Sequence, residues 1–216
     1  MLRTSVNIGK GGQPNIDGFW SKSLSGPTDI RAFNKESQLP TAHVFIATSL
    51  DGFIARPDGD IDWLLQRDDP SEDHGYSDFI ADKDVIVMGR GSYEKVRTFD
   101  TWFYDRPVVV VSEQLADSPV PEVLRGKLRF SSLAPKDLMT ELASQGVQRV
   151  YVDGGQVVQS FLRDGLVTDM VITTVPVLIG SGRPLFGGLG RDVDLQLVSS
   201  RSFPSGLVQS TYRLVP

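Results

Sequence analysis

Residues 84–94, D-V-I-V-M-G-R-G-S-Y-E, constrain the fold of this chain more than any other stretch. The range 85–88 is entirely apolar, which is typical of a strand buried on both faces of a largely parallel sheet. Gly89 ends this strand, Arg90 adds a permanent cation at its carboxyl end, and Ser92 is the expected N-cap of a following helix. A helix N-terminus beside a guanidinium suits a phosphate, and ligands of open α/β sheets bind at such strand ends. The alternative is an ordinary strand-to-helix turn in which Arg90 pairs with a surface carboxylate.

Composition excludes several classes of function. The chain has 216 residues and a formal net charge of −5, whereas non-specific nucleic-acid binding requires a basic face. Cysteine is absent and His43 and His74 are the only histidines, so a disulfide framework, a thiolate nucleophile and a multi-histidine metal centre are excluded. No apolar run approaches the roughly 20 residues that span a bilayer. The N-terminal residues lack the apolar segment of a secretion signal, so we expect a cytoplasmic protein without a membrane partner.

Strand and helix patterns alternate along the middle of the chain and then give way to strands only. The expected strands cover 43–49, 85–88, 108–112, 128–130, 149–152, 169–177, 195–203 and 207–214. The expected helices cover 72–82, the residues after Ser92, 135–145 and 156–164. This order predicts an α/β domain with a mostly parallel sheet, antiparallel C-terminal strands and helices on both faces. Pro176 interrupts the strand 169–177, which suggests a bulge or an apolar edge suited to a homodimer.

Residues 1–39 differ in composition from residues 40–216. They are rich in Gly, Ser, Asn, Lys and Pro, and their few apolar residues follow no sustained period. We therefore expect a polar N-terminal tail outside the core, followed by one domain over 40–216. The G-K-G-G of residues 9–12 lacks the spacing of a P-loop, so a linker is the better interpretation.

Two of the predicted strands end in glycine and lead directly into helices. The first offers Gly89-Arg90-Gly91-Ser92 and the second offers Gly154-Gly155-Gln156-Val157. Residues without side chains let a backbone approach a ligand closely, and helix N-termini supply N–H donors for a pyrophosphate. A third strand ends in Val111-Ser112-Glu113, where the Ser112 hydroxyl is placed to meet an adenosine ribose. Three such strand ends predict a dinucleotide site, although the G-x-G-x-x-G of a Rossmann site is absent.

Several short motifs together resemble a known family. They are A-T-S-L-D-G-F-I-A at 47–55, M-G-R-G-S-Y-E at 88–94, V-V-S at 110–112, V-D-G-G at 152–155, L-R-D-G-L-V-T-D at 162–169 and P-V-L-I-G-S-G-R-P-L-F at 176–186. In this order they resemble the dihydrofolate reductase superfamily. The closest resemblance is to the branch shared with the C-terminal reductase domain of riboflavin biosynthesis, and it covers residues 41–215.

The resemblance implies a single dihydrofolate reductase-like domain with a mainly parallel sheet of about eight strands. It also implies NADPH as cofactor. Carried over residue by residue, it places Ala47 and Thr48 at the nicotinamide end, with Gly52 to Ile54 as the flexible loop over it. It assigns phosphates to Gly89, Arg90, Gly91 and Ser92, the adenosine side to Val111 and Ser112, and the pyrophosphate to Gly154, Gly155, Gln156 and Val157. Relatives that prefer NADPH commonly carry a basic or neutral polar residue where this chain has Glu113. A carboxylate repels a 2′-phosphate, so NADH is not excluded.

The resemblance also suggests residues for catalysis and substrate binding. Asp51 of S-L-D-G is the first candidate for orienting or protonating a substrate, and a turn-forming role before Gly52 is at least as common. Asp73 has the spacing of the carboxylate that binds the pterin in dihydrofolate reductases, although helix-face carboxylates are more often only solvated. Trp63 and Phe79 are the expected substrate-pocket residues, with core packing as the alternative for Trp63.

The resemblance therefore implies an NAD(P)H-dependent oxidoreductase that transfers a hydride to a small substrate of pteridine or pyrimidine type. The riboflavin-pathway step itself is a weaker match, because that enzyme usually carries an N-terminal zinc deaminase domain or extra basic residues for the substrate phosphate. One alternative is a nucleotide-binding protein that has kept this fold without catalysis. Another is an enzyme that binds a different nucleotide, such as a flavin. No metal site and no nucleic-acid partner are expected.

Overall fold

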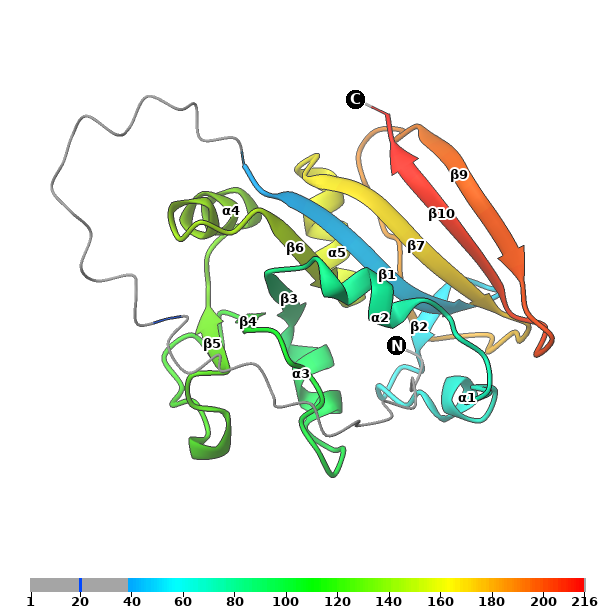
Figure 1. Ribbon diagram of the computed structural model, residues 1–216, viewed down its shortest axis with the longest axis horizontal. Helices are drawn as coiled ribbons and strands as arrows, with labels where there is room; N and C mark the ends of the chain where they lie inside the picture. The colour runs from blue at the N-terminus through cyan, green and yellow to red at the C-terminus, as the bar shows by residue number, and fades with distance from the viewer. Residues whose placement is uncertain (1–19, 21–38, 216) are drawn as a thin grey trace, which may run out of the picture.

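One large sheet organises the described part of the chain, which comprises Trp20 and residues 39–215 of this computed structural model (Figure 1). Its strands are β1 (Thr41–Ser49), β3 (Val85–Gly89), β4 (Val108–Val111), β5 (Leu128–Ser131), β6 (Arg149–Asp153), β7 (Val167–Val175), β9 (Leu195–Ser202) and β10 (Val208–Leu214). A small second sheet pairs β2 (Phe53–Ala55) with β8 (Arg183–Pro184). The helices are α1 (Asp62–Leu65), α2 (Tyr76–Ala81), α3 (Arg90–Val96), α4 (Pro135–Ser144) and α5 (Gly155–Arg163), with a 3₁₀ turn at Glu122–Leu124.

The strand order of the large sheet is β5-β4-β3-β6-β1-β7-β10-β9. Neighbouring strands from β5 to β7 run parallel, whereas β10 and β9 are antiparallel additions at one edge. The predicted α/β class, the mostly parallel sheet of eight strands and the antiparallel C-terminal strands are therefore confirmed.

Apolar side chains pack on both faces of the sheet, and helices cover both. On one face Val87 and its neighbours pack against Phe161 and other side chains of α4 and α5. On the other face Met88 packs with Tyr93 of α3 and with Phe79 of α2. Alternate residues of β3 thus enter different cores, which explains why its sequence is apolar throughout.

Two helix starts differ from the predictions by more than one residue. The helix expected over 72–82 begins at Tyr76, because Gly75 adopts a left-handed conformation with φ of 77° that no helix accommodates. Helix α3 begins at Arg90 with the extended residue Gly89 as its N-cap, so the predicted capping role of Ser92 is wrong. Ser92 lies inside the first turn instead, where its hydroxyl group faces the neighbouring strand end.

Strand β7 is an interior strand, which overturns the prediction of an edge at 169–177. It pairs with β1 on one side and β10 on the other. Pro176 falls just after the last strand residue, Val175, so it costs no ladder hydrogen bond. An irregularity in the pairing of β7 with β1 lies at the opposite end, between Ala42 and His43. The exposed edge on this side of the sheet is β9, so a homodimer can no longer be argued from 169–177.

Most of the predicted N-terminal tail, residues 1–39, lies outside the described residues. Within it, Trp20 is half-buried and packs against the core that α4 and α5 share. The guanidinium carbon of Arg129 lies 4.6 Å from the centre of the Trp20 ring, within the range of a cation–π contact.

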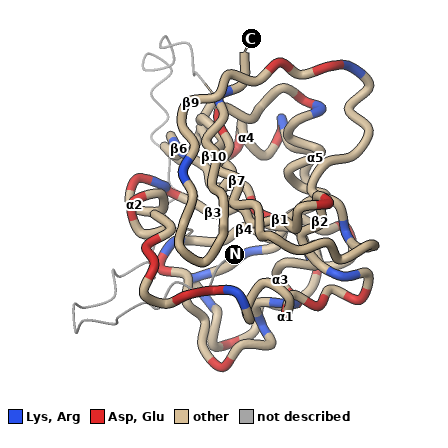
Figure 2. The backbone as a smooth tube through the Cα atoms, turned by 90° about the vertical axis from the view of Figure 1, so that its right-hand side faces the viewer, with Lys and Arg blue, Asp and Glu red and all other residues tan. Residues whose placement is uncertain are grey.

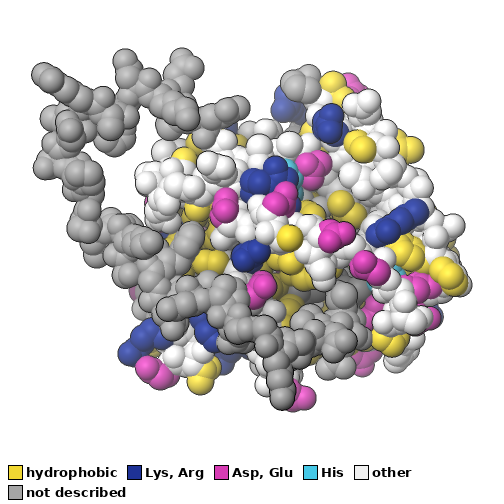
Figure 3. All heavy atoms as spheres, viewed as in Figure 1, with side chains coloured by type: hydrophobic (Ala, Val, Ile, Leu, Met, Phe, Trp, Pro, Cys, Tyr) yellow, Lys and Arg dark blue, Asp and Glu magenta, His cyan; other side chains and the backbone are white. Residues whose placement is uncertain are grey.

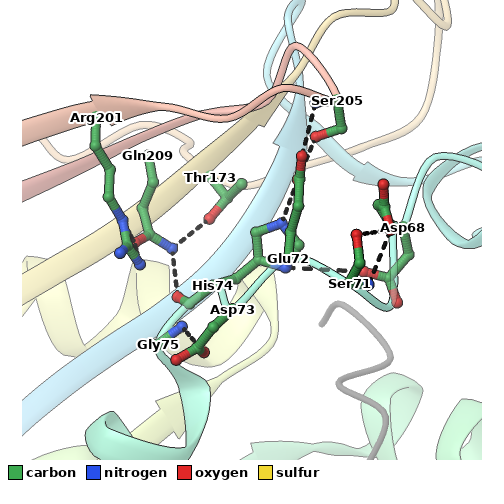
Figure 4. A network of polar contacts seen from close by, with 11 residues as sticks. Asp68, Ser71, Glu72, Asp73, His74, Gly75, Thr173, Arg201, Ser205 and Gln209 are labelled. Carbon is green, nitrogen blue, oxygen red and sulfur yellow. Dashed lines mark hydrogen bonds and ion pairs between the residues drawn. The ribbon is translucent and has the colours of Figure 1, made fainter.

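The segment between α1 and α2, residues 66–75, is rich in acidic residues, which Figure 2 colours red. Polar contacts drawn in Figure 4 anchor it to the β9–β10 hairpin. His74 is 2% exposed, and its Nε2 lies 3.2 Å from Glu72 Oε2. Glu72 accepts hydrogen bonds from the backbone N–H and the hydroxyl of Ser205, at 2.7 and 2.5 Å. The Nε2 of Gln209 donates to the backbone oxygen of His74 at 3.0 Å and to Thr173 Oγ1 at 2.9 Å. These contacts hold the segment that leads into α2.

Replacing Gln209 with Ala is expected to lower the free energy of unfolding by about 1–3 kcal/mol. The change leaves the buried His74 carbonyl without its amide donor and removes a partner from the Thr173 hydroxyl. Denaturant unfolding followed by circular dichroism measures the difference. Ser200→Ala is the control, because it removes only an exposed hydroxyl contact with Ser210 on the same hairpin. Equal effects of both changes would contradict the anchoring role of Gln209.

The surface carries both signs of charge. On the face shown in Figure 3, basic and acidic side chains are interspersed over the coloured residues rather than gathered by sign. Within the described residues, no helix combines the length and the apolar character needed to cross a membrane.

Candidate functional site

A large cleft with a volume of about 1090 Å³ opens where β1, β3 and β6 end, which is where ligands of α/β sheets bind. Its size is ample for a cofactor and a small substrate together. The small β2–β8 sheet and helices α1, α3 and α5 form its walls. Residues of this main cleft include Ala47, Ile54, Leu64, Leu65, Tyr76, Gly89 to Ser92, Lys95, Phe99, Phe103, Asp153 to Val157 and Gly182 to Pro184.

Glycines allow the chain segments around the main cleft to approach closely. Gly154 has φ of 89°, and a Cβ atom there would lie 2.5 Å from Ser92 Oγ. A Cβ atom on Gly155 would lie 2.7 Å from the backbone oxygen of Pro184. No side chain caps the start of α5, so its first backbone N–H groups keep their hydrogen-bonding capacity. The turn between β6 and α5 can therefore offer backbone donors to an anion.

Arg90 and Lys95 are two of the basic side chains of the main cleft. Arg90 Nη1 lies 2.8 Å from Glu94 Oε1, so its charge is shared with a carboxylate one helical turn away. Lys95 Nζ lies 4.0 Å from Asp60 Oδ1. Both pairs are partly exposed and weak, so a bound anion can compete with either carboxylate.

Arg183, on β8, is the third cation, and among the described residues it forms no ion pair within 4.0 Å. Its Nε donates a hydrogen bond to the backbone oxygen of Pro57 at 3.2 Å. Its Nη1 lies only 3.1 Å from the place a Cβ of Gly91 would take. A fork-shaped permanent cation is thus held against the glycine-containing start of α3, facing the cleft.

Asp153 is the buried acid of the main cleft. It is the last residue of β6, only 6% exposed, and directly precedes Gly154. Burial raises the pKa of its carboxyl group, while hydrogen bonds from the Gly154 backbone and the Ser92 hydroxyl act in the opposite direction. Burial likewise raises the pKa of Tyr76, and the nearby Asp153 carboxylate adds to that rise. The cleft therefore holds a carboxyl group that keeps its proton to higher pH than an exposed aspartate.

A smaller pocket of about 280 Å³ adjoins the main cleft, and Val157 lines both. We call it the side pocket. It lies beyond the end of β4, between the starts of α4 and α5, and is lined by Val111, Glu113, Ser132, Leu133, Ala134, Pro135, Leu138, Val157, Ser160 and Phe161. Because Val157 lines both cavities, they adjoin at the ends of neighbouring strands, and we call the two together the groove. The described residues contain no group of three or more His, Cys, Asp or Glu side chains arranged to hold a metal ion.

Residues 40–209 match the RibD C-terminal domain family, which accounts for most of the chain. The chain belongs to this family. YwjB, an uncharacterized protein of Bacillus subtilis, is 32% identical to it over 162 residues, covering 74% of this chain and 90% of YwjB. The riboflavin biosynthesis protein RibD of Corynebacterium ammoniagenes is 29% identical over 169 residues, covering 72% of this chain but only 49% of RibD.

Solved structures of RibD C-terminal domain relatives have the same architecture. A Shewanella sp. PV-4 protein provisionally named a riboflavin biosynthesis protein is 36% identical, with a TM-score of 0.76 over 82% of this chain and 99% of that chain. A Thermotoga maritima deaminase/reductase is 14% identical, with a TM-score of 0.64, over 82% of this chain and 57% of that one. The predicted resemblance to the dihydrofolate reductase superfamily, through its riboflavin-biosynthesis branch, is confirmed.

The structure brings most of the predicted cofactor residues of this RibD C-terminal domain to one groove. The main cleft gathers Ala47, Ile54, Gly89, Arg90, Gly91, Ser92, Gly154, Gly155, Gln156 and Val157. Val111 lines the side pocket, and Thr48, Gly52 and Ser112 line neither cavity. The Ser112 hydroxyl accepts a hydrogen bond from the backbone N–H of Leu115 at 3.3 Å, so part of its capacity is used within the turn.

The predicted catalytic residues Asp51 and Asp73 lie outside the main cleft. Asp51 accepts hydrogen bonds from the backbone N–H groups of Ile179 and Gly180, at 3.3 and 2.7 Å, and so ties the first turn to a distant loop. A hydrogen bond from the Ser49 side chain is the main cause that lowers the pKa of Asp51, which opposes a role as proton donor. Asp73 is exposed and accepts from the backbone N–H of Gly75 at 2.7 Å, beside the start of α2.

The predicted substrate residues Trp63 and Phe79 are packed in the cores. Trp63 is 3% exposed and belongs to a cluster with Ala47, Leu64 and other residues, so the core-packing alternative describes its position. Phe79 packs edge-on against Tyr151, with ring centres 5.1 Å apart. Neither side chain lines the main cleft.

Sequence reasoning missed Asp153 and Arg183 as residues of the site. Both stand inside motifs that carried the family resemblance, V-D-G-G and S-G-R-P-L-F. The signal for Asp153 was its place at the end of an apolar strand and immediately before two glycines. Arg183 had no comparable signal, because it lies in a glycine-rich loop whose pairing with β2 is visible only in three dimensions.

Proposed function

We propose that this protein is a reductase that binds a nicotinamide dinucleotide along the groove and reduces a small heteroaromatic substrate in the main cleft. The observation that carries the proposal is the buried Asp153 carboxyl group, placed between the glycine turn of α5 and the apolar part of the cleft. A protonated acid beside a reducible ring is what such a reduction requires from the protein.

The residues of the groove suit a dinucleotide in their chemistry. The uncapped start of α5 and the guanidinium of Arg183 offer N–H donors and positive charge to a pyrophosphate. Because Gly91 has no side chain, the guanidinium of Arg183 lies close to the start of α3. The main cleft and the side pocket would each take one end of the molecule, with Val157 between them.

The remaining space of the main cleft suits a flat ring of pteridine or pyrimidine type. Its walls include Leu64, Leu65, Phe99 and Phe103, which offer apolar contact to the faces of such a ring. Tyr76 and the Asp153 carboxyl group supply hydrogen-bonding groups at its polar edge.

The chemistry divides between cofactor and protein. When bound, a reduced nicotinamide would supply the hydride for a carbon atom of the substrate. Asp153 supplies the proton to the adjacent nitrogen or oxygen and is reprotonated from solvent after product leaves. The apolar walls exclude water from the reacting atoms. Arg183 and the start of α5 hold the phosphates and do not take part in the proton transfer.

The test of this function is oxidation of the reduced dinucleotide, followed by its near-ultraviolet absorbance, with a panel of dihydropteridines, oxidised pterins and aminopyrimidines. We expect turnover with at least one compound of the panel and loss of turnover in Asp153→Asn. Tight dinucleotide binding without turnover across the panel would favour the alternative of a binding protein that has kept the fold.

Arg183→Ala is expected to weaken dinucleotide binding by about tenfold or more, equivalent to 1.4 kcal/mol, because it removes the guanidinium that no described carboxylate neutralises. Calorimetric titration with NADH measures the dissociation constant. Arg191→Ala is the matched control, since it removes an exposed arginine of the same connection that lines neither cavity. A dissociation constant of Arg183→Ala equal to that of Arg191→Ala would argue against phosphate binding by Arg183.

A further inference from the structure

We propose that this protein selects NADH over NADPH, because Glu113 presents a carboxylate where the adenosine end of the dinucleotide binds. The inference rests on the proposed function and specifies its cofactor.

The two cavities differ in what they can hold. The main cleft has a volume of about 1090 Å³ and contains the buried acid, so it has room for both a reacting ring and a substrate. The side pocket, at about 280 Å³, has room for one nucleoside-sized group. It is walled by apolar side chains such as Val111, Leu133 and Phe161, with the hydroxyl groups of Ser132 and Ser160 as polar contacts. This composition suits an adenine ring and assigns the adenosine to the side pocket.

The two cavities also differ in charge. The main cleft is lined by the cations Arg90, Lys95 and Arg183 and by the acidic residues Glu94, Asp100 and Asp153. Among the residues that line the side pocket, Glu113 alone is charged, and it stands at the end of β4, two residues beyond Val111. Its side chain is exposed and forms no ion pair with any described residue. The main cleft therefore offers cations to a pyrophosphate, whereas the described lining of the side pocket carries one carboxylate and no cation.

The cations that flank the side pocket are engaged elsewhere or lie outside it. Arg129 of β5 is paired with Glu141 Oε1 through its guanidinium group, at 2.6 Å. Arg90 lines the main cleft and not the side pocket, and it shares its charge with Glu94. Lys136 belongs to α4 but does not line the pocket. Among the described residues no cation lines the side pocket, so a 2′-phosphate there would meet the Glu113 carboxylate. The two hydroxyl groups of an NADH ribose can instead donate hydrogen bonds to that carboxylate.

The test is calorimetric titration of the full chain with NADH and, separately, NADPH, with thermal melting in the presence of each as a second readout. We expect the wild-type protein to bind NADH at least about tenfold more tightly than NADPH, a difference of 1.4 kcal/mol. Glu113→Gln should reduce that ratio to about threefold or less, mainly by tighter NADPH binding, because the amide removes the charge and keeps the shape. Glu122→Gln, a neutralisation at an exposed glutamate that lines neither cavity, should leave the ratio unchanged.

The outcomes separate the inference from the function on which it rests. Equal affinity for the two dinucleotides, or tighter binding of NADPH, would overturn the inference and leave the proposed reductase intact. A preference for NADH that survives Glu113→Gln unchanged would overturn the role of Glu113. Failure of both dinucleotides to bind the folded wild-type protein would overturn the proposed function itself.

Discussion

Asp153→Asn is expected to lower kcat by about 100-fold or more, the usual contribution of a positioned general acid. The amide retains the size of the side chain but has no proton to give to the substrate. Asp153 is buried where the glycine turn meets the apolar part of the cleft. Among the described acidic residues that line the cleft, it alone is buried, so no other is equally suited to replace it. We expect NADH affinity to change by no more than about threefold, since the residue does not hold the phosphates.

The pH dependence of the wild-type reduction rate tests the same role of Asp153 as proton donor. Burial raises the pKa of the Asp153 carboxyl group, so its donating form persists above the range of an exposed aspartate. The rate should therefore be highest below this raised pKa and should fall as the pH rises through it. In Asp153→Asn that fall should disappear. Asp192→Asn, a change at an exposed residue outside both cavities, serves as the control and should keep the wild-type profile. A slow variant that retained the pH profile would show that another group donates the proton.

Gly155→Ala is expected to lower the free energy of unfolding by about 1–3 kcal/mol and to weaken dinucleotide binding at the same time. The added Cβ would lie 2.7 Å from the backbone oxygen of Pro184 and 3.2 Å from Ile54 Cδ1. Backbone cannot move aside as a flexible side chain does, so the β2–β8 sheet must shift. That sheet carries Arg183, and its displacement should therefore reach the phosphate site.

Gly188→Ala is the matched control for this prediction. It lies in the same glycine-rich connection, and a Cβ there would meet no atom within 4 Å. Its unfolding midpoint and its NADH affinity should equal those of the wild type. If Gly155→Ala also behaved like the wild type in both measurements, the close contact between α5 and β8 would not shape the cleft.

The order and type of the main elements follow from local sequence, and their boundaries depend on tertiary contacts. An apolar run such as 85–88 is typical of a strand that is buried by helices on both faces of the sheet, and residues 85–88 are buried in this way in β3. The start of α2 was not predictable, because it depends on the conformation of Gly75 and on the anchoring of His74 by Gln209, a residue 135 positions away. The position of β7 inside the sheet was missed because Pro176 was taken as part of the strand.

The site was predictable where it is made of backbone and unpredictable where it depends on which side chains meet. Glycines at strand ends mark close approach, and Gly89, Gly91, Gly154 and Gly155 lie together at the cleft. The roles of carboxylates cannot be read in this way. Asp51 and Asp153 both precede a glycine. The Asp51 carboxylate accepts a hydrogen bond from the backbone N–H of Gly180, whereas Asp153 is buried beside the cleft. Asp153 ends β6, which lies between β3 and β1 in the sheet, whereas Asp51 lies in the turn after β1.

The central claim is that one groove holds a nicotinamide dinucleotide with its reacting ring beside Asp153. A crystal structure of the protein with NADH tests this most directly. The account predicts the nicotinamide ring in the main cleft next to the Asp153 carboxyl group, the pyrophosphate at the start of α5 and Arg183, and the adenosine in the side pocket beside Glu113. An adenosine in the main cleft, or a groove that stays empty at millimolar NADH, would contradict it.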